Sequence, residues 1–202
     1  SITARYDDPA ELAAFGARFL IYPLHYEPEA IISYWSSFTN QLALAMAAFD
    51  NLPSDTYLLL KEHPSQPGAL QQEKWKGLVG NKRVKCIHGK VKMADLLTTP
   101  SALISIGSTA VLETVLHGRP AFVVGQPHFL AMPGVTPITD WGEFDIEWDA
   151  APAEESALKE WYGNFVNRHC VSGQFIRGRT DFPQAERVIG RLLEVANEEG
   201  RP

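Results

Sequence analysis

Histidine and hydroxyl side chains of the kind that bind phosphate follow two apolar runs of the sequence. His63 comes shortly after the run 56–60, and the proline after it biases its backbone toward an extended conformation, so that the imidazole would project in a defined direction. Ser108 and Thr109 follow the run 102–105. An imidazole near neutral pH donates a hydrogen bond to a phosphate and, when protonated, neutralises charge on a departing one. This spacing favours phosphate binding, with a turn histidine and an ordinary capped helix as the alternative interpretations.

The segment 103–120 predicts a strand, a turn and a helix, and we take the rest of the chain to be organised around it. Gly107 permits a tight turn, and Ser108 or Thr109 can cap the helix. Gly118 then ends the helix. A helix N-terminus just beyond a strand leaves backbone N–H groups unpaired, so that an anion can be held there. The apolar face of this helix would consist of Val111, Leu112 and Val115.

Further candidate residues lie near the same predicted strand ends. The loop 25–29 follows the apolar run 19–24 and contains His25 and Glu27. Lys61 could pair with a phosphate or with its neighbour Glu62. The carboxylate of Glu113, about one turn into the central helix, could reach ribose hydroxyls or simply be solvated.

Apolar strands that alternate with helices predict an α/β fold with a doubly wound, mostly parallel, Rossmann-like sheet of about five strands. We expect a linker or short helix over 1–18, a Rossmann-like nucleotide-sugar-binding core over 19–137, and a C-terminal helical extension over 138–202 packed on the same domain. The predicted strands cover 19–24, 56–60, 84–87, 102–105 and 121–124. The predicted helices start near 9 and cover 36–49, 69–79, 92–97, 108–117, 156–169 and 184–197.

In an open α/β sheet the ligand lies across the carboxyl ends of the strands. The loops 25–29, 61–64 and 105–109 are therefore expected to point into one crevice. Such a site binds phosphate without an obvious hydrolytic apparatus, which suits a nucleotide-sugar whose leaving group is the nucleotide.

The composition argues against several other classes of function. The chain has 202 residues and a formal net charge of −6, which disfavours broad binding to nucleic acids or anionic membranes. No apolar run approaches the roughly 20 residues of a membrane span. Cys86 and Cys170 show neither metal-ligand spacing nor a disulfide framework, so we expect a reducing cytoplasm. The sequence lacks a dinucleotide fingerprint, a phosphate-binding loop and a nucleophile elbow, and its histidines are not spaced as metal ligands, so we predict no cofactor and no metal.

Four segments of the sequence are more specific together than any one of them is alone. They are Tyr22-Pro23-Leu24-His25-Tyr26-Glu27-Pro28-Glu29, Lys61-Glu62-His63-Pro64, Ser105-Ile106-Gly107-Ser108-Thr109-Ala110-Val111-Leu112-Glu113 and Gly118-Arg119-Pro120. This ordered set resembles the capsule polysaccharide biosynthesis family, which includes bacterial Kdo transferases and is similar in architecture to CMP-sialic acid transferases with two Rossmann-like domains. The resemblance covers roughly 19–133.

The resemblance implies a glycosyltransferase that uses a CMP-activated sugar such as CMP-Kdo, with a glycan or glycolipid acceptor. It implies that His63 is catalytic, because it helps the nucleotide to depart, and that Ser108 and Thr109 contact the nucleotide phosphate. The resemblance further implies that Glu113 contacts the ribose and that Gln126 or His128 lines the pocket. The predicted donor site as a whole comprises Lys61, His63, Ser105, Gly107, Ser108, Thr109, Glu113, His25, Glu27, Gln126 and His128.

The chain has the length of only the C-terminal, donor-binding half of such an enzyme. Because it also begins without methionine, we expect a missing N-terminal domain that carries the acceptor site and a catalytic carboxylate, although Glu27 and Glu29 are candidates for the base. The expected location is cytoplasmic, with peripheral attachment to the inner membrane through a partner as an option. The alternatives are a nucleotide-sugar epimerase-like enzyme and a non-catalytic nucleotide-binding or assembly module.

Overall fold

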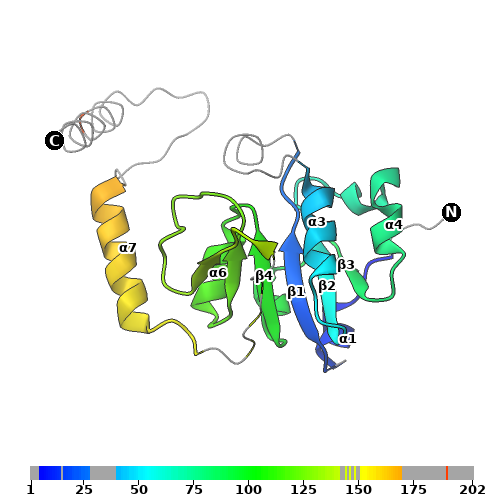
Figure 1. Cartoon of the computed structure of the whole chain (residues 1–202), viewed down its shortest axis with the longest axis horizontal. Coiled ribbons are helices and arrows are strands. Elements are labelled where there is room, and N and C mark those ends of the chain that lie inside the picture. Colours follow the sequence, from blue (N-terminus) through cyan, green and yellow to red (C-terminus); the bar gives the residue numbers. More distant parts are fainter. Residues whose placement is uncertain are drawn as a thin grey trace. The chain divides into compact units, whose positions relative to one another are not determined.

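The structure is a computed structural model, which describes residues 5–14, 16–27, 40–141, 144, 146, 148, 151–169 and 190. A parallel sheet forms the core of its first compact unit, Ser1–Glu154. Its six strands have the order β3-β2-β1-β4-β5-β6, and all five neighbouring pairs are parallel (Figure 1). The strands are β1 (Arg18–Pro23), β2 (Thr56–Lys61), β3 (Val84–Ile87), β4 (Ser101–Ser105), β5 (Ala121–Val123) and β6 (Val135–Pro137). The doubly wound Rossmann-like α/β fold that the sequence predicts is therefore confirmed.

Helices precede β1, follow β6 and occupy the connections between successive strands from β1 to β5. The first, α1, begins at the predicted Asp8-Pro9 signal, and Asp8 accepts a hydrogen bond from the N–H of Ala10 at 2.8 Å. The end of the helix that precedes β4 and the start of the central helix both lie close to their predicted positions. Gly118 ends the central helix with a φ of 68°. The helical segments are α1 (Pro9–Ala14), α3 (Gln41–Asp50), η1 (Ala69–Gln71), η2 (Glu73–Trp75), α4 (Lys76–Val79), α5 (Met93–Leu96), α6 (Ala110–Leu116) and α7 (Glu155–His169).

Both faces of the strands β1, β2 and β4 are buried, which explains why these strands are almost continuously apolar. On one face, alternate residues of β1 and β2 such as Leu20 and Leu58 pack with Leu44 of α3 and Trp75 of η2 in one core cluster. The residues between them, such as Ile21, point to the opposite face and are also buried. A strand that is covered on both sides cannot alternate between polar and apolar residues, and this is typical of parallel sheets.

Three expectations about the elements are wrong. The helix predicted from 36 begins at Gln41, because Asn40 has an extended backbone and caps it by accepting from the N–H of Leu42 at 2.9 Å. The helix predicted over 69–79 is broken into η1, η2 and α4, since Gln72 is extended. The strand β6 was not predicted, because its three residues include Pro137; proline fits here because β6 lies at the edge of the sheet.

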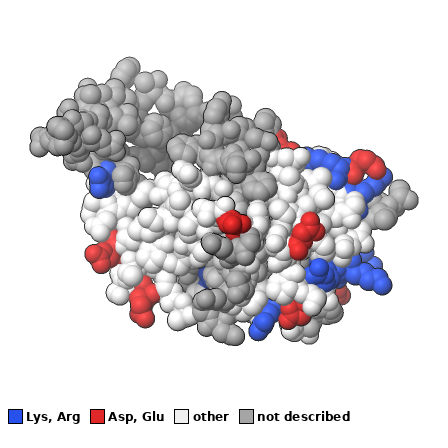
Figure 2. Space-filling view, viewed as in Figure 1, with Lys and Arg blue, Asp and Glu red and all other residues white. Residues whose placement is uncertain are grey.

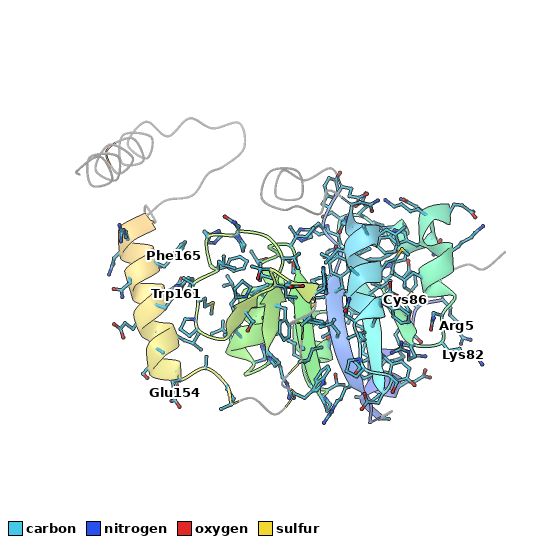
Figure 3. All side chains as sticks on the ribbon, in the orientation of Figure 1. Arg5, Lys82, Cys86, Glu154, Trp161 and Phe165 are labelled. Carbon is cyan, nitrogen blue, oxygen red and sulfur yellow. The ribbon has the colours of Figure 1, made fainter. Side chains whose placement is uncertain are left out.

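The chain divides into two compact units, Ser1–Glu154 and Glu155–Pro202. In the second unit, the predicted helix over 156–169 is confirmed as α7, where the rings of Trp161 and Phe165 stack with centroids 5.3 Å apart (Figure 3). The helix predicted over 184–197 lies outside the described residues except for Gly190. The predicted packing of the C-terminal extension on the core stays a prediction.

Charges of both signs are interspersed on the face drawn in Figure 2, and they gather at the end of the sheet that carries α4. The ion pair between Lys76 and Glu73 belongs to this end. Within the described ranges, no helix combines the length and the apolar character that a bilayer crossing requires.

Candidate functional site

The strand order places the predicted site residues at one edge of the sheet. The order reverses between β1 and β4, because the chain proceeds outward from β1 to β2 and β3 on one side and from β4 to β5 and β6 on the other. Ligands of open α/β sheets bind outside the carboxyl ends of the strands at such a switch point. The loops after β1, β2 and β4 all start at this edge, so the shared edge predicted for loops 25–29, 61–64 and 105–109 is present as far as residue 27.

His25 and Ser105 meet at the switch point. Nε2 of His25 lies 3.3 Å from Oγ of Ser105, and this contact joins the loop after β1 to the end of β4. Both residues are buried, with exposed fractions of 4% and 0%. Neither side chain therefore presents a surface to a ligand in this structure.

The hydroxyl of Ser105 organises the turn that follows β4. Its Oγ accepts hydrogen bonds from the N–H of Gly107 at 3.2 Å and from the N–H of Ser108 at 2.9 Å, and Oγ of Ser108 accepts from the N–H of Ala110 at 3.2 Å. The expectation of unpaired N–H groups at this helix N-terminus is thus wrong for these three groups. Thr109 makes no side-chain cap, so the hydroxyl protons of Ser108 and Thr109 are donors that the turn offers.

Gln41 connects α3 to the loop after β1. Its Oε1 accepts from the N–H of His25 at 2.6 Å, and its Nε2 donates to the carbonyl of His25 at 3.1 Å and to Oε1 of Glu27 at 2.8 Å. Gln66 holds the backbone of Glu27 in the same way, accepting from its N–H at 3.0 Å and donating to its carbonyl at 3.3 Å. The loop after β1 is therefore held from α3 and from the loop after β2.

Glu27 is a fixed anion in this arrangement. Burial alone would raise the pKa of its carboxyl, but hydrogen bonds from Lys74, at 2.8 Å, and from Gln41, together with the charge of Lys74, outweigh burial and lower the pKa. A carboxylate with a lowered pKa is a weak base at neutral pH. The other base candidate, Glu29, lies outside the described residues.

His63 is half-buried, and in the described part of the chain a backbone N–H binds one of its ring nitrogens, Nδ1. Its Nδ1 accepts from the N–H of Ser65 at 3.1 Å, so the neutral ring carries its proton on Nε2 and can donate from there. Tyr26 packs edge-on against the imidazole, with ring centroids 5.8 Å apart. The backbone of His63 is also tightly confined, because a Cβ on Gly89 would lie 2.7 Å from its carbonyl oxygen.

Lys61 and Glu62 lie beneath the protein surface, and their hydrogen bonds hold the loop that carries His63. The ammonium of Lys61 donates to the carbonyls of Glu62 at 3.2 Å and of Gly89 at 3.1 Å, and burial lowers its pKa despite the opposing charges of Glu113 and Glu62. The carboxylate of Glu62 accepts from the N–H groups of Gly68 at 3.1 Å and Leu70 at 2.9 Å. Two of the three N–H donors of Lys61 thus bind protein carbonyls, and its predicted contact with a phosphate stays a prediction.

The remaining predicted residues are placed less centrally. Glu113 is exposed on α6, although its charge acts on Lys61 and so reaches the loop after β2. Gln126 and His128 are exposed and follow β5, which is one strand farther from β1 than Ser105 is. The structure therefore brings together the loops that carry His25, Glu27, Lys61, His63, Ser105, Gly107, Ser108 and Thr109 more closely than it does Gln126 and His128.

Sequence reasoning missed three residues that shape this site, namely Gln41, Gly89 and the carboxylate of Glu62. Gln41 is 2% exposed and Glu62 is 1% exposed. A polar residue at the start of an apolar helix and a glycine two residues after a strand were the available signals. Neither identifies a partner without the tertiary structure.

The fold and the strand-end loops define a Rossmann-like α/β domain with a polar site at its topological switch point. The chain belongs to the capsule polysaccharide biosynthesis protein family, whose sequence model matches residues 6–178. This match confirms the resemblance and extends it on both sides. No curated protein matches the sequence significantly.

Several solved structures resemble the chain at low identity. KpsC from Thermosulfurimonas dismutans, a beta Kdo 2,7 transferase, is 20% identical with a TM-score of 0.48, and the match covers 64% of this chain and 40% of that one. The glycosyltransferase SnogD from Streptomyces nogalater is 17% identical with a TM-score of 0.39, with coverages of 72% and 37%. MnaA from S. aureus in complex with UDP is 10% identical with a TM-score of 0.43, with coverages of 84% and 51%. The chain thus spans about half or less of each of these proteins.

Proposed function

We propose that this chain is the donor-binding half of a glycosyltransferase that uses a CMP-activated sugar, such as CMP-Kdo, in capsule or surface polysaccharide biosynthesis. The observation that carries the proposal is the linkage of the loops after β1, β2 and β4 at the switch point, through the His25–Ser105 contact and the hydrogen bonds between Gln66 and Glu27. Membership of the capsule polysaccharide biosynthesis family supports it.

In the proposed reaction an acceptor hydroxyl attacks the anomeric carbon of the sugar, and the bond from that carbon to the phosphate oxygen of CMP breaks. The phosphate leaves with the bonding electron pair. Nε2–H of His63 donates to a phosphate oxygen, and the hydroxyls of Ser108 and Thr109 donate to the same group, so the developing negative charge is stabilised. Glu113, farther along α6, is assigned to the ribose hydroxyls.

The proton of the acceptor hydroxyl must go to a base. Glu27 is poorly suited because its pKa is lowered and both carboxylate oxygens already accept hydrogen bonds, from Gln41 and Lys74. We therefore assign the base and the acceptor site to an N-terminal domain that this chain does not contain. A cytoplasmic location and peripheral attachment to the inner membrane belong to the same proposal.

Calorimetric titration of the chain with CMP, UDP and GDP tests the proposal. We expect binding that favours CMP, that weakens with His63→Ala and with the double change Ser108→Ala, Thr109→Val, and that is unchanged with His88→Ala. His88 is a matched control because its Nδ1 accepts from the N–H of Lys90 at 3.1 Å, as that of His63 does from Ser65. A preference for UDP would instead favour an epimerase-like enzyme. Failure to bind any nucleotide, together with capture of a partner protein, would favour an assembly module.

A further inference from the structure

The hydroxyl of Ser105 has a complete set of hydrogen-bond partners in the described part of the chain. A serine oxygen has two lone pairs, and the N–H groups of Gly107 and Ser108 occupy both. Its proton therefore remains for Nε2 of His25 at 3.3 Å. A ring nitrogen that accepts carries no proton, so this network requires the neutral His25 to be protonated on Nδ1.

The backbone of His25 is fixed from the other direction. The side-chain amide of Gln41 pairs with its N–H at 2.6 Å and with its carbonyl at 3.1 Å, in the manner of one peptide group pairing with another. Gln41 is the first residue of α3, and its side chain is buried. The first residue of α3 therefore fixes the backbone position of the loop after β1.

We propose that His25 is a positioning residue, held as the Nδ1–H tautomer, which couples Gln41 to the Ser105 hydroxyl and so fixes the turn that presents Ser108 and Thr109. The sequence interpretation gave His25 a direct contact with the donor, but a residue that is 4% exposed and already bonded to Ser105 acts through the turn instead. The effect on donor binding rests on the function proposed above, whereas the coupling itself does not.

His25 and His63 should therefore show opposite tautomers. The Nδ1 atom of His63 accepts from Ser65, which leaves the proton on Nε2, while Nε2 of His25 accepts from Ser105. In ¹⁵N-labelled chain at neutral pH, long-range ¹⁵N–¹H correlation spectra distinguish protonated from unprotonated ring nitrogens. We expect Nδ1–H for His25 and Nε2–H for His63 and His88. Detection of His25 as the Nε2–H tautomer would overturn the proposal without any variant.

The coupling is tested with Gln41→Met, which keeps the length of the side chain but removes both hydrogen bonds to His25. Amide hydrogen exchange at Gly107 and Ser108 should become about tenfold faster, because a loosened His25 no longer holds the Ser105 hydroxyl. Gln72→Met is the matched control, since Gln72 lines the same small cavity beside Gln41 but is exposed. Unchanged exchange at Gly107 and Ser108 in a folded Gln41→Met chain would contradict the coupling.

Ser105→Ala provides a second variant, which leaves the Gln41 and His25 side chains in place and removes only the hydroxyl that contacts His25. It should release His25 from the Nδ1–H tautomer while leaving His63 and His88 unchanged. If His25 keeps the same tautomer in this variant, Ser105 does not determine it and the proposal is wrong.

Titration with CMP separates this inference from the proposed function. If the wild-type chain binds CMP, Gln41→Met should weaken binding about five- to tenfold and Gln72→Met should leave it unchanged. If no chain binds CMP but the tautomers and the exchange rates follow the expectation, the proposed function fails and the coupling stands. If CMP binds equally to wild type and Gln41→Met while exchange at Gly107 is altered, the turn does not position the donor and the inference fails.

Discussion

Two histidines, His63 and His88, occupy nearly the same local environment at the ends of neighbouring strands. Each uses Nδ1 to accept from the N–H two residues later, at 3.1 Å in both cases, and each packs edge-on against a tyrosine, Tyr26 for His63 and Tyr6 for His88. They differ in what surrounds them. His63 follows β2, which lies beside β1 and shares loop contacts with it, whereas His88 follows β3 at the outer edge. The proposed function therefore distinguishes the two histidines by the strand that each follows and not by their local geometry.

The largest expected effect is a difference in activity between substitutions at these two histidines. In the full-length protein, His63→Ala should slow sugar transfer about 10²- to 10⁴-fold, because a donor to the leaving phosphate is lost. His88→Ala should leave the rate nearly unchanged. Initial rates with a CMP-sugar donor measure both. Equal losses for the two variants would mean that strand position does not distinguish the histidines.

The next prediction concerns the packing that links the two loops. A Cβ on Gly89 would lie 2.7 Å from the carbonyl oxygen of His63 and 3.0 Å from Cα of Pro64, and both are backbone atoms that cannot move alone. Gly89→Ala should therefore lower the free energy of unfolding by about 1 to 3 kcal/mol. Gly77→Ala is the control, because Gly77 lies in α4 and the added carbon would meet nothing within 4 Å beyond its own helix backbone and chain neighbours. This change should be neutral or stabilising. Urea unfolding of both variants decides the matter; a Gly89→Ala chain as stable as wild type would refute the close contact.

A smaller effect is expected on the His88 side, at Tyr6. Burial, a hydrogen bond to Glu62 and the charge of Glu62 raise the pKa of Tyr6 to about 12 from 10.0. A raised pKa means that the stabilisation is complete below pH 10 and is lost as the pH rises through about 12. Tyr6→Phe should lower the free energy of unfolding by about 1 to 2 kcal/mol at pH 7 and make it less sensitive to pH between 10 and 12. If the free energy of unfolding falls equally for the variant and the wild type between pH 10 and 12, Tyr6 does not make this contribution.

The smallest expected effect is on the His63 side, at Glu27. Its pKa is lowered mainly because hydrogen bonds from Lys74 and Gln41 outweigh burial, so its stabilisation is present above the ordinary carboxyl pKa and is lost as the pH falls through the lowered value. The pair with Lys74 is partly exposed, so Glu27→Gln should cost about 0.2 to 1 kcal/mol at pH 7 and less in acid. Glu73→Gln, in a pair whose glutamate is 81% exposed, should cost nothing measurable. Acid titrations of stability would reveal the difference, and equal costs would argue against the Glu27 network.

Much of the fold could be predicted from the sequence because the strong signals are local. Gly118 ends α6 with a positive φ, Asp8-Pro9 starts α1, and the continuous apolar runs at β1, β2 and β4 indicate a parallel sheet buried on both faces. β6 could not be predicted in this way. Three residues that include a proline have no periodicity, and their pairing depends on the neighbouring β5.

The site could be predicted less completely. Strand ends identify which loops meet, and so His63 and Ser108 could be proposed from spacing alone. The sequence does not show that Ser105 uses its hydroxyl on its own turn, that Lys61 binds carbonyls, or that Gln41 holds His25, because each of these depends on an atom from another element. The structure gives these buried polar side chains protein partners, whereas their predicted contacts with a ligand stay predictions.

The most direct test of the account is a titration of ¹⁵N-labelled chain with CMP, followed through its amide and imidazole resonances. We predict that the shifts concentrate at Nε2 of His63 and at the amides of Ser108 and Thr109, while those of His88 stay constant. Shifts confined to His88 or to the cavity lined by Thr136, Asp140 and Phe144 would place the nucleotide elsewhere and contradict the account.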